Sequence, residues 1–196
     1  MTPPIRIGFA LTGSFCTHAR ALTALQTLID RGYAVTPILS EAAGTLDTRF
    51  GTAADLRRQL SQMTGVPIID SIFAAEPIGP KELFDVLAVA PCTANTMAKL
   101  TAGIADGTVT MAVKSHLRGG RPVVLAVSTN DGLAASAVNL GALLARRHYY
   151  FVPLRQDAPR AKPRSLVADF SLLPAAVEAA LAGEQLQPIL LAPGEI

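Results

Sequence analysis

Short apolar runs alternate with longer amphipathic stretches along the whole chain. Apolar runs of this length predict buried strands, here at residues 5–11, 34–39, 67–72, 85–90, 122–127 and 149–154. The amphipathic stretches have apolar residues every three or four positions and predict helices at residues 17–31, 52–63, 93–105, 108–117, 131–147 and 172–181. Polar residues dominate segments 41–51 and 155–164, which predict a loop and an exposed excursion.

Alternation of strands and helices is typical of a parallel sheet with helices on both faces. We therefore expect an α/β fold, a three-layer αβα sandwich around a Rossmann-like, mostly parallel sheet of about six strands. No linker or low-complexity tract divides the chain. Residues 1–196 are accordingly expected to form a single domain.

The composition excludes several classes of protein. Half of the residues are hydrophobic and only 16% are charged, which argues against disorder. The net charge of +2 comes without a dense basic stripe, so nucleic acid is not an expected partner. No apolar stretch reaches the ~20 residues that a membrane span needs, and residues 1–7 lack a secretory layout. We expect a cytoplasmic protein.

Cysteines and histidines are too scattered to form a recognisable metal site. Cys16, Cys92, His18, His116 and His148 show no zinc-binding spacing, so no metal is expected. Cys16 precedes a predicted helix, where a thiolate is favoured, but a small packed cysteine is the simpler interpretation. His18 could act as an acid or a base beside the first loop. Neither residue is assigned a catalytic role on this basis.

Ligands of open α/β sheets bind beyond the carboxyl ends of the strands, so the loops that follow the strands are the candidate site. In the first loop, Gly13 permits a tight turn, and the hydroxyls of Ser14 and Thr17 stand at a helix start where a phosphate can bind. The alternative is that these hydroxyls only cap the helix. The second and third glycines of the dinucleotide-binding pattern are missing, which argues against classical NAD binding.

Hydroxyl and amide side chains also crowd two later loops. Thr93, Asn95 and Thr96 follow the strand that Pro91 is expected to end, and three such residues exceed what capping needs. An anion or a polar ring edge is therefore expected there. Ser128-Thr129-Asn130-Asp131 follows the next strand, with Asp131 as the expected helix cap. Ser40, after the second predicted strand, is a lone hydroxyl.

Three of these segments together resemble the homo-oligomeric flavin-containing decarboxylase family, which includes phosphopantothenoylcysteine decarboxylase and the flavin prenyltransferases. They are Thr12-Gly13-Ser14, Ser40 at a strand end and Pro91-x-Thr-Ala-Asn-Thr96. The resemblance covers most of the chain. It implies an FMN site built from these loops and shared across the subunits of a trimer or a larger homo-oligomer.

By position, the resemblance also implies roles for individual residues. Gly13 and Ser14 would meet the flavin phosphate or ribityl chain, with Ser40 on the phosphate side. The implied phosphate-binding and flavin-flanking residues are Thr93, Ala94, Asn95 and Thr96. Ser128 and Thr129 would approach the flavin ring.

Other segments look like the B-subunit family of dipicolinate synthases, among them Gly8–Thr17, Asp47–Gly51, Ser128–Leu133 and Gln156–Pro159. This narrower resemblance implies an oxidoreductase subunit that supports oxidation of a dihydrodipicolinate precursor to pyridine-2,6-dicarboxylate during sporulation. A partner A subunit would carry NADP. Lys162 and Arg164 could clamp the dicarboxylate or a neighbouring chain, or could belong to a solvated loop.

Two departures from the decarboxylases bear on the reaction. Those enzymes carry a histidine on the helix after the second strand and a Pro-x-Met-Asn motif after the fifth, and this chain has no histidine between His18 and His116. Ser128-Thr129-Asn130 stands where the motif is expected. These departures argue against an independent FMN-dependent decarboxylase, which is kept as the first alternative. A non-catalytic structural partner of the A subunit is the second alternative.

Overall fold

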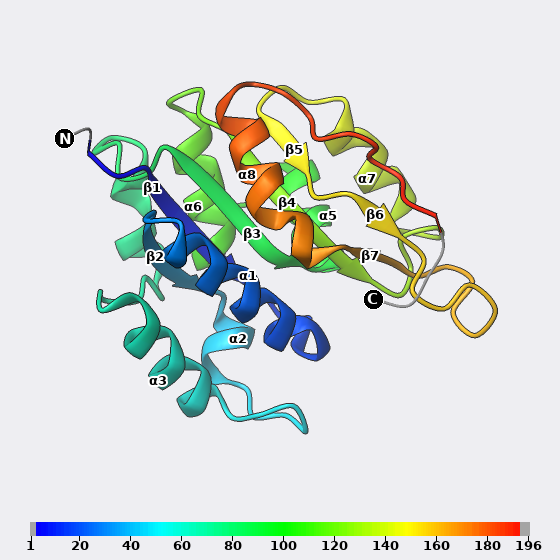
Figure 1. Ribbon diagram of the computed structural model, residues 1–196, viewed down its shortest axis with the longest axis horizontal. Coiled ribbons are helices and arrows are strands. Elements are labelled where there is room, and N and C mark those ends of the chain that lie inside the picture. Colours follow the sequence, from blue (N-terminus) through cyan, green and yellow to red (C-terminus); the bar gives the residue numbers. More distant parts are fainter. Residues whose placement is uncertain (1–2, 193–196) are drawn as a thin grey trace.

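The computed structural model describes residues 3–192, which fold around one central twisted sheet with helices packed against it (Figure 1). Its centre is five parallel strands in the order β2-β1-β3-β4-β5. These strands are β1 (Arg6–Leu11), β2 (Ala34–Leu39), β3 (Val86–Cys92), β4 (Val123–Thr129) and β5 (Tyr149–Phe151). The short strand β7 (Leu166–Ala168) pairs antiparallel with the end of β4, and β6 (Leu154–Arg155) pairs antiparallel with β7. The predicted Rossmann-like, mostly parallel sheet is confirmed.

Helices cover both faces of the sheet, as the three-layer prediction requires (Figure 1). One face carries α1 (His18–Asp30) and α8 (Leu173–Leu181). The other carries α5 (Ala94–Ala102), α6 (Thr108–Leu117) and α7 (Ala137–Leu144). Near the β2 edge lie α2 (Glu41–Thr45), α3 (Ala53–Thr64) and α4 (Ile72–Ala75). Short 3-10 turns are η1 (Phe15–Thr17), η2 (Glu76–Ile78) and η3 (Phe170–Leu172). No helix within residues 3–192 is long and apolar enough to cross a bilayer.

The central strands are apolar along their length because they are buried on both faces. All seven residues of β3 and six of the seven residues of β4 are buried. A strand between two helical layers has no solvent side, so its sequence is a continuous apolar run rather than an alternating one. The helices bury a single stripe instead, and α1 contributes Ala21, Ala24, Leu25 and Leu28 to the core.

Two predicted segments differ in the structure. Residues 67–72 do not form a strand, since only Ile69 pairs with β2, through two backbone hydrogen bonds to Pro37 and Leu39. Residues 41–51 are not wholly a loop, because α2 begins at Glu41. The Ser40 hydroxyl starts this helix by accepting from the Ala43 N–H at 3.2 Å.

Strand β3 does not end at Pro91 as expected, but continues to Cys92. Its register against β4 shifts between Val89 and Cys92. Such a bulge accommodates proline, which has no N–H to give to the ladder. The strand therefore carries the Pro91 carbonyl beyond the expected strand end, toward the loop after β1.

Gly79 is predicted to tolerate no side chain. A Cβ there would lie 2.0 Å from the Ser115 backbone oxygen, whereas one at Gly141 on α7 would meet nothing within 4 Å. We expect Gly79→Ala to lower the free energy of unfolding by about 1–3 kcal/mol, and Gly141→Ala to raise it by roughly 0.5–1 kcal/mol. Urea unfolding of both variants measures this. Equal changes in the free energy of unfolding for the two variants would contradict the close approach of Gly79 to the Ser115 backbone of α6.

Buried His116 is predicted to make stability fall in mild acid. Its Nε2 donates to the Pro122 carbonyl at 3.1 Å, Nδ1 has no partner among the described residues, and burial lowers its pKa to about 4. The unfolded state, with an ordinary histidine pKa of 6.5, takes up the proton first as pH falls. The contribution of neutral His116 to the free energy of unfolding is complete above pH 6.5 and is lost progressively as the pH falls to 4.

We expect the step from pH 7 to pH 5 to cost about 2 kcal/mol through this residue. Urea unfolding at the two pH values should show a smaller loss in His116→Gln than in the native chain. His148→Gln is the control, because it replaces an exposed histidine and leaves buried His116 in place. An unchanged pH difference in His116→Gln would refute the assignment.

Candidate functional site

A groove of about 600 Å³ opens over the carboxyl ends of β1, β3 and β4. The strand order reverses between β1 and β3, because the chain runs outward from β1 to β2 and returns to the other side of β1. Loops leave such a switch point toward opposite faces and leave a crevice between them. The lining comes from Gly13–Thr17, Arg20, Phe50, Thr93–Asn95, Ser128–Asp131, Asp157, Lys162 and Val167. Its volume is in the range of small-molecule sites.

Most of the residues predicted from the loops meet in this groove. Seven of the nine line it, namely Gly13, Ser14, Thr93, Ala94, Asn95, Ser128 and Thr129. Ser40 and Thr96 do not belong to the lining. The Ser40 hydroxyl caps α2, and Thr96 is only 6% exposed, with its hydroxyl 2.9 Å from that of Thr93.

Buried Thr12 joins the first loop to the third. Its hydroxyl donates to the Pro91 carbonyl at 2.7 Å and accepts from the Thr93 N–H at 3.2 Å. The side chain is nearly inaccessible, at 2% exposure. One hydroxyl thus satisfies two backbone groups of the β3 loop, which fixes the start of α5 against the end of β1.

The loop after β4 is tied to the same frame. Ser14 donates to the Ser128 carbonyl at 2.8 Å, although β3 lies between the strands from which these two residues come. Asp131 accepts from Thr129 and, at 2.9 Å, from Ser136, and the Thr129 hydroxyl holds its pKa below the usual range. Asp131 thus stabilises a turn before α7, which begins only at Ala137 and not at residue 131 as expected.

The N-terminus of α5 supplies free donors to the groove. Thr93 caps the helix by accepting from the Thr96 N–H at 3.1 Å. The N–H groups of Ala94 and Asn95, in the first turn, have no hydrogen-bond partner within residues 3–192. First-turn N–H groups and the helix dipole favour an anion. The Asn95 side chain is exposed beside them.

Gly13 leaves room for a ligand that the fold itself does not require. A Cβ at this position would make only ordinary contacts, 3.7 Å from Ala42 and 3.8 Å from Phe15, and the backbone has no positive φ. Packing therefore does not demand glycine here. Its absence of a side chain keeps the groove wall open beside Ser14.

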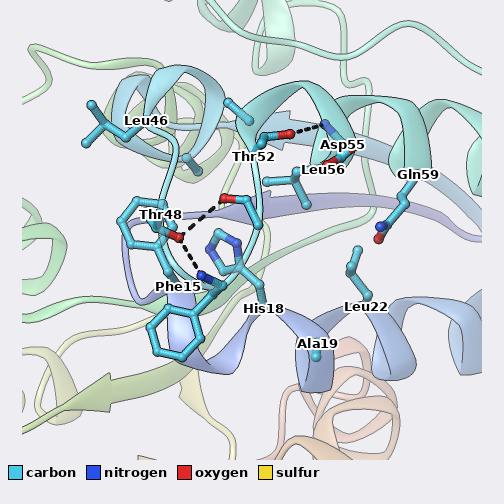
Figure 2. Close-up of a pocket in the computed structure, with 14 residues that line it drawn as sticks. Phe15, His18, Ala19, Leu22, Leu46, Thr48, Thr52, Asp55, Leu56 and Gln59 are labelled. Carbon is cyan, nitrogen blue, oxygen red and sulfur yellow. Dashed lines mark hydrogen bonds between the residues drawn. The ribbon is translucent and has the colours of Figure 1, made fainter.

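A smaller hollow of about 190 Å³ adjoins the groove and shares Phe15 and Phe50 with it (Figure 2). Figure 2 shows His18 in this hollow, between Phe15 and Thr48. Its Nε2 donates to the Thr12 carbonyl at 2.7 Å, and burial lowers the pKa of the ring. Burial thus favours the neutral form of His18. Exposed Cys16 lines the groove itself.

Two charged groove residues were not assigned to the site from the sequence. Arg20 reaches the groove from α1 and lies one helical turn after Cys16, so helical spacing could have identified it. Asp157 comes from the excursion between β6 and β7, where the sequence pointed to it only as part of the Gln156–Pro159 resemblance and suggested a ligand role for Lys162 and Arg164 alone. Lys162 lines the groove and lies 3.1 Å from the Asp157 carboxylate, whereas Arg164 is not in the lining.

Positive charge is concentrated around a separate pocket of about 410 Å³, on the face of the sheet that carries α5, α6 and α7. Lys114, Arg118, Arg146 and Arg147 surround it. Arg146 donates to the carbonyls of Leu100 and Thr101 in α5. The cations lie near helix C-termini, which attract positive charge. Residues 3–192 contain no group of three or more histidine, cysteine, aspartate or glutamate residues arranged to hold a metal.

Comparisons with known proteins identify the family of the chain. The family model described as Flavoprotein matches residues 1–150. The B subunit of dipicolinate synthase from Bacillus subtilis (strain 168) is 43% identical over 186 residues, which cover 95% of this chain and 93% of that protein. The crystal structure of the dipicolinate synthase B subunit from Bacillus halodurans has a TM-score of 0.88 and 42% identity, covering 95% of this chain and 96% of that one.

The FMN-dependent cysteine decarboxylase SpaF shares the fold at lower identity. It is 21% identical with a TM-score of 0.65, and the match covers 90% of this chain and 97% of that chain. Sequence and fold thus lead to the same conclusion. The chain belongs to the flavoprotein family, in the branch that contains the B subunits of dipicolinate synthases.

Proposed function

We propose that the groove binds FMN and that the chain is the flavin-binding subunit of an oxidoreductase that forms pyridine-2,6-dicarboxylate. The observation that carries this proposal is the meeting of seven predicted loop residues in one groove at the β1/β3 switch point. The names of two relatives at 42–43% identity support the dicarboxylate product.

The residues present fit a flavin mononucleotide. The free N–H groups of Ala94 and Asn95, at the positive end of α5, suit the phosphate. Open space at Gly13 lets the ribityl chain approach the backbone, and Ser128 and Thr129 would hold the ring from the β4 side. When bound, the flavin supplies a two-electron acceptor for oxidation. Ser40 and Thr96 act on this site only indirectly, through α2 and through Thr93.

The chain would work with two kinds of protein partner. A dehydrogenase A subunit would carry NADP and complete the oxidation of the dihydrodipicolinate precursor, in the cytoplasm of a sporulating cell. Further copies of this chain would form a trimer or a multiple of it. Phe50 is 54% exposed beside the groove, and Phe73 on α4 is 87% exposed. Large exposed aromatic side chains of this kind favour protein interfaces.

The decarboxylase alternative lacks the histidine that is expected on the helix after β2. Four α3 residues line the hollow beside the groove, namely Ala53, Asp55, Leu56 and Gln59, and none is a histidine (Figure 2). His18 comes from α1 and donates to the Thr12 carbonyl. These features favour the oxidoreductase subunit over an independent cysteine decarboxylase.

Binding of FMN should depend on the charge at the start of α5. Asn95→Asp puts a carboxylate beside the expected phosphate, and we expect the dissociation constant to rise about 10- to 100-fold through repulsion and loss of a charge-assisted hydrogen bond. Quenching of flavin fluorescence during titration measures it. An acidic residue in a first turn favours the helix, so the variant should remain folded.

Asn139→Asp is the matched control, because Asn139 stands in the first turn of α7 and does not line the groove. Its affinity for FMN should equal that of the native chain. Equal affinities in all three proteins would show that the phosphate lies elsewhere. If the native chain did not quench FMN fluorescence at any protein concentration, the proposal that the groove binds FMN would be wrong.

Turnover should require the A subunit. We expect the FMN-loaded chain with precursor and NADP to produce no NADPH, and addition of the A subunit to start production. The absorbance of NADPH follows the reaction. Full turnover by this chain alone would contradict the division of labour between the subunits.

A further inference from the structure

Arg20 brings a buried and unpartnered cationic donor to the groove. It is the third residue of α1 and lies over the Phe170 ring, with its guanidinium carbon 5.6 Å from the ring centroid. Its Nη1 is buried and donates no hydrogen bond within the described chain, residues 3–192. No carboxylate in that part of the chain lies within ion-pair distance of Arg20.

A buried charged donor without an acceptor is costly, so its position requires an explanation. Stacking on Phe170 holds the guanidinium plane but satisfies no N–H group. Arg155 already occupies the nearby Asp169 carboxylate, at 2.7 Å. Arg20 lines both the groove and a neighbouring pocket of about 300 Å³ that contains Phe170. Of the two, the groove contains the predicted ligand-binding loops, so the acceptor for Arg20 is expected from a molecule bound there.

Asp157 brings to the same groove a buried carboxylate oxygen that has no hydrogen-bond donor in the described part of the chain. Its Oδ2 pairs with Lys162 at 3.1 Å, but its buried Oδ1 accepts no hydrogen bond within residues 3–192. Asp131, the other groove carboxylate, has Thr129 and Ser136 as donors. The groove thus offers one unused cationic donor and one unused anionic acceptor.

We propose that Arg20 binds a carboxylate of the substrate and that Asp157 accepts from an N–H or O–H group on the same molecule. This inference rests on the proposed function and names the substrate subsite within its groove. A guanidinium matches a carboxylate through two parallel N–H donors. The phosphate of FMN has separate donors at the start of α5, so Arg20 remains for the substrate. Among residues 3–192, Arg20 and Lys162 are thus the two cationic side chains that line the groove, whereas Arg164, which the sequence suggested together with Lys162, lies outside the lining.

Calorimetric titration of the FMN-loaded chain with pyridine-2,6-dicarboxylate and with pyridine-2-carboxylate tests the Arg20 contact. The native chain should prefer the dicarboxylate. Arg20→Gln should weaken dicarboxylate binding by about 10- to 100-fold, as expected for loss of a charge-assisted pair, and should abolish the preference. Arg20→Lys should restore part of the affinity, since the charge returns without the forked donors.

Arg164→Gln is the control, as it removes the same charge from an exposed position outside the lining. It should leave both affinities unchanged. Unchanged FMN affinity in Arg20→Gln verifies that this variant is folded. A loss of FMN binding with unaltered dicarboxylate binding would assign Arg20 to the flavin phosphate and overturn the inference, while the proposed function would stand.

Two other results separate the inference from the proposed function. A native chain that binds FMN but neither acid overturns the substrate subsite alone. A chain that binds no FMN ends the flavin proposal, and titration of the flavin-free chain with the two acids then still decides whether Arg20 selects the second carboxylate.

The Asp157 contact has its own measurement. Piperidine-2,6-dicarboxylate carries N–H donors on its ring, whereas the pyridine nitrogen is an acceptor. The native chain should bind the piperidine acid more tightly relative to the pyridine acid than Asp157→Asn does. The same ratio in both proteins would exclude a contact of Asp157 with the substrate.

Discussion

The hydroxyl of Thr12 is the contact on which the candidate site depends. It donates to the Pro91 carbonyl and accepts from the Thr93 N–H, so it closes the gap between the ends of β1 and β3. Without it, two buried backbone groups would lose their partners at the point where the strand order reverses. The carbonyl of the same residue accepts from His18 and thereby fixes the start of α1. One threonine thus sets the positions of two helix N-termini.

Rigid loops at this point matter because backbone N–H groups and small hydroxyls, rather than charged side chains, are proposed to hold the flavin. Ser14 extends the link to the Ser128 carbonyl, so the loops after three adjacent strands form one hydrogen-bonded frame. The free N–H groups of α5 and the space at Gly13 are useful only if the frame holds them in place. The frame is made of backbone groups and small hydroxyls, which explains why the lining is rich in threonine and serine residues.

The sheet was predictable from the sequence because buried parallel strands leave continuous apolar runs. The loop residues were predictable for a related reason, since strand ends in such a sheet converge on one edge, and the family resemblance assigned them to a flavin. Tertiary contacts were not predictable. Pro91 was taken as a strand end because proline breaks ladders, yet a bulge carries β3 past it. Ser40 was placed at the ligand, but the local backbone of α2 uses its hydroxyl.

Arg20 illustrates the limit most clearly. Its importance comes from Phe170, which lies 150 positions later in the chain, and from the lack of a partner for Nη1, and neither follows from a local pattern. Asp157 likewise enters the groove from an excursion whose path depends on the pairing of β6 and β7 with β4.

A crystal structure of the chain grown with FMN tests the central claim most directly. The account predicts a flavin in the groove over the ends of β1, β3 and β4, with its phosphate at the N–H groups of Ala94 and Asn95. The Thr12 link to Pro91 and Thr93 should be unchanged. A flavin bound elsewhere, for example in the pocket surrounded by Lys114, Arg118, Arg146 and Arg147, would contradict it.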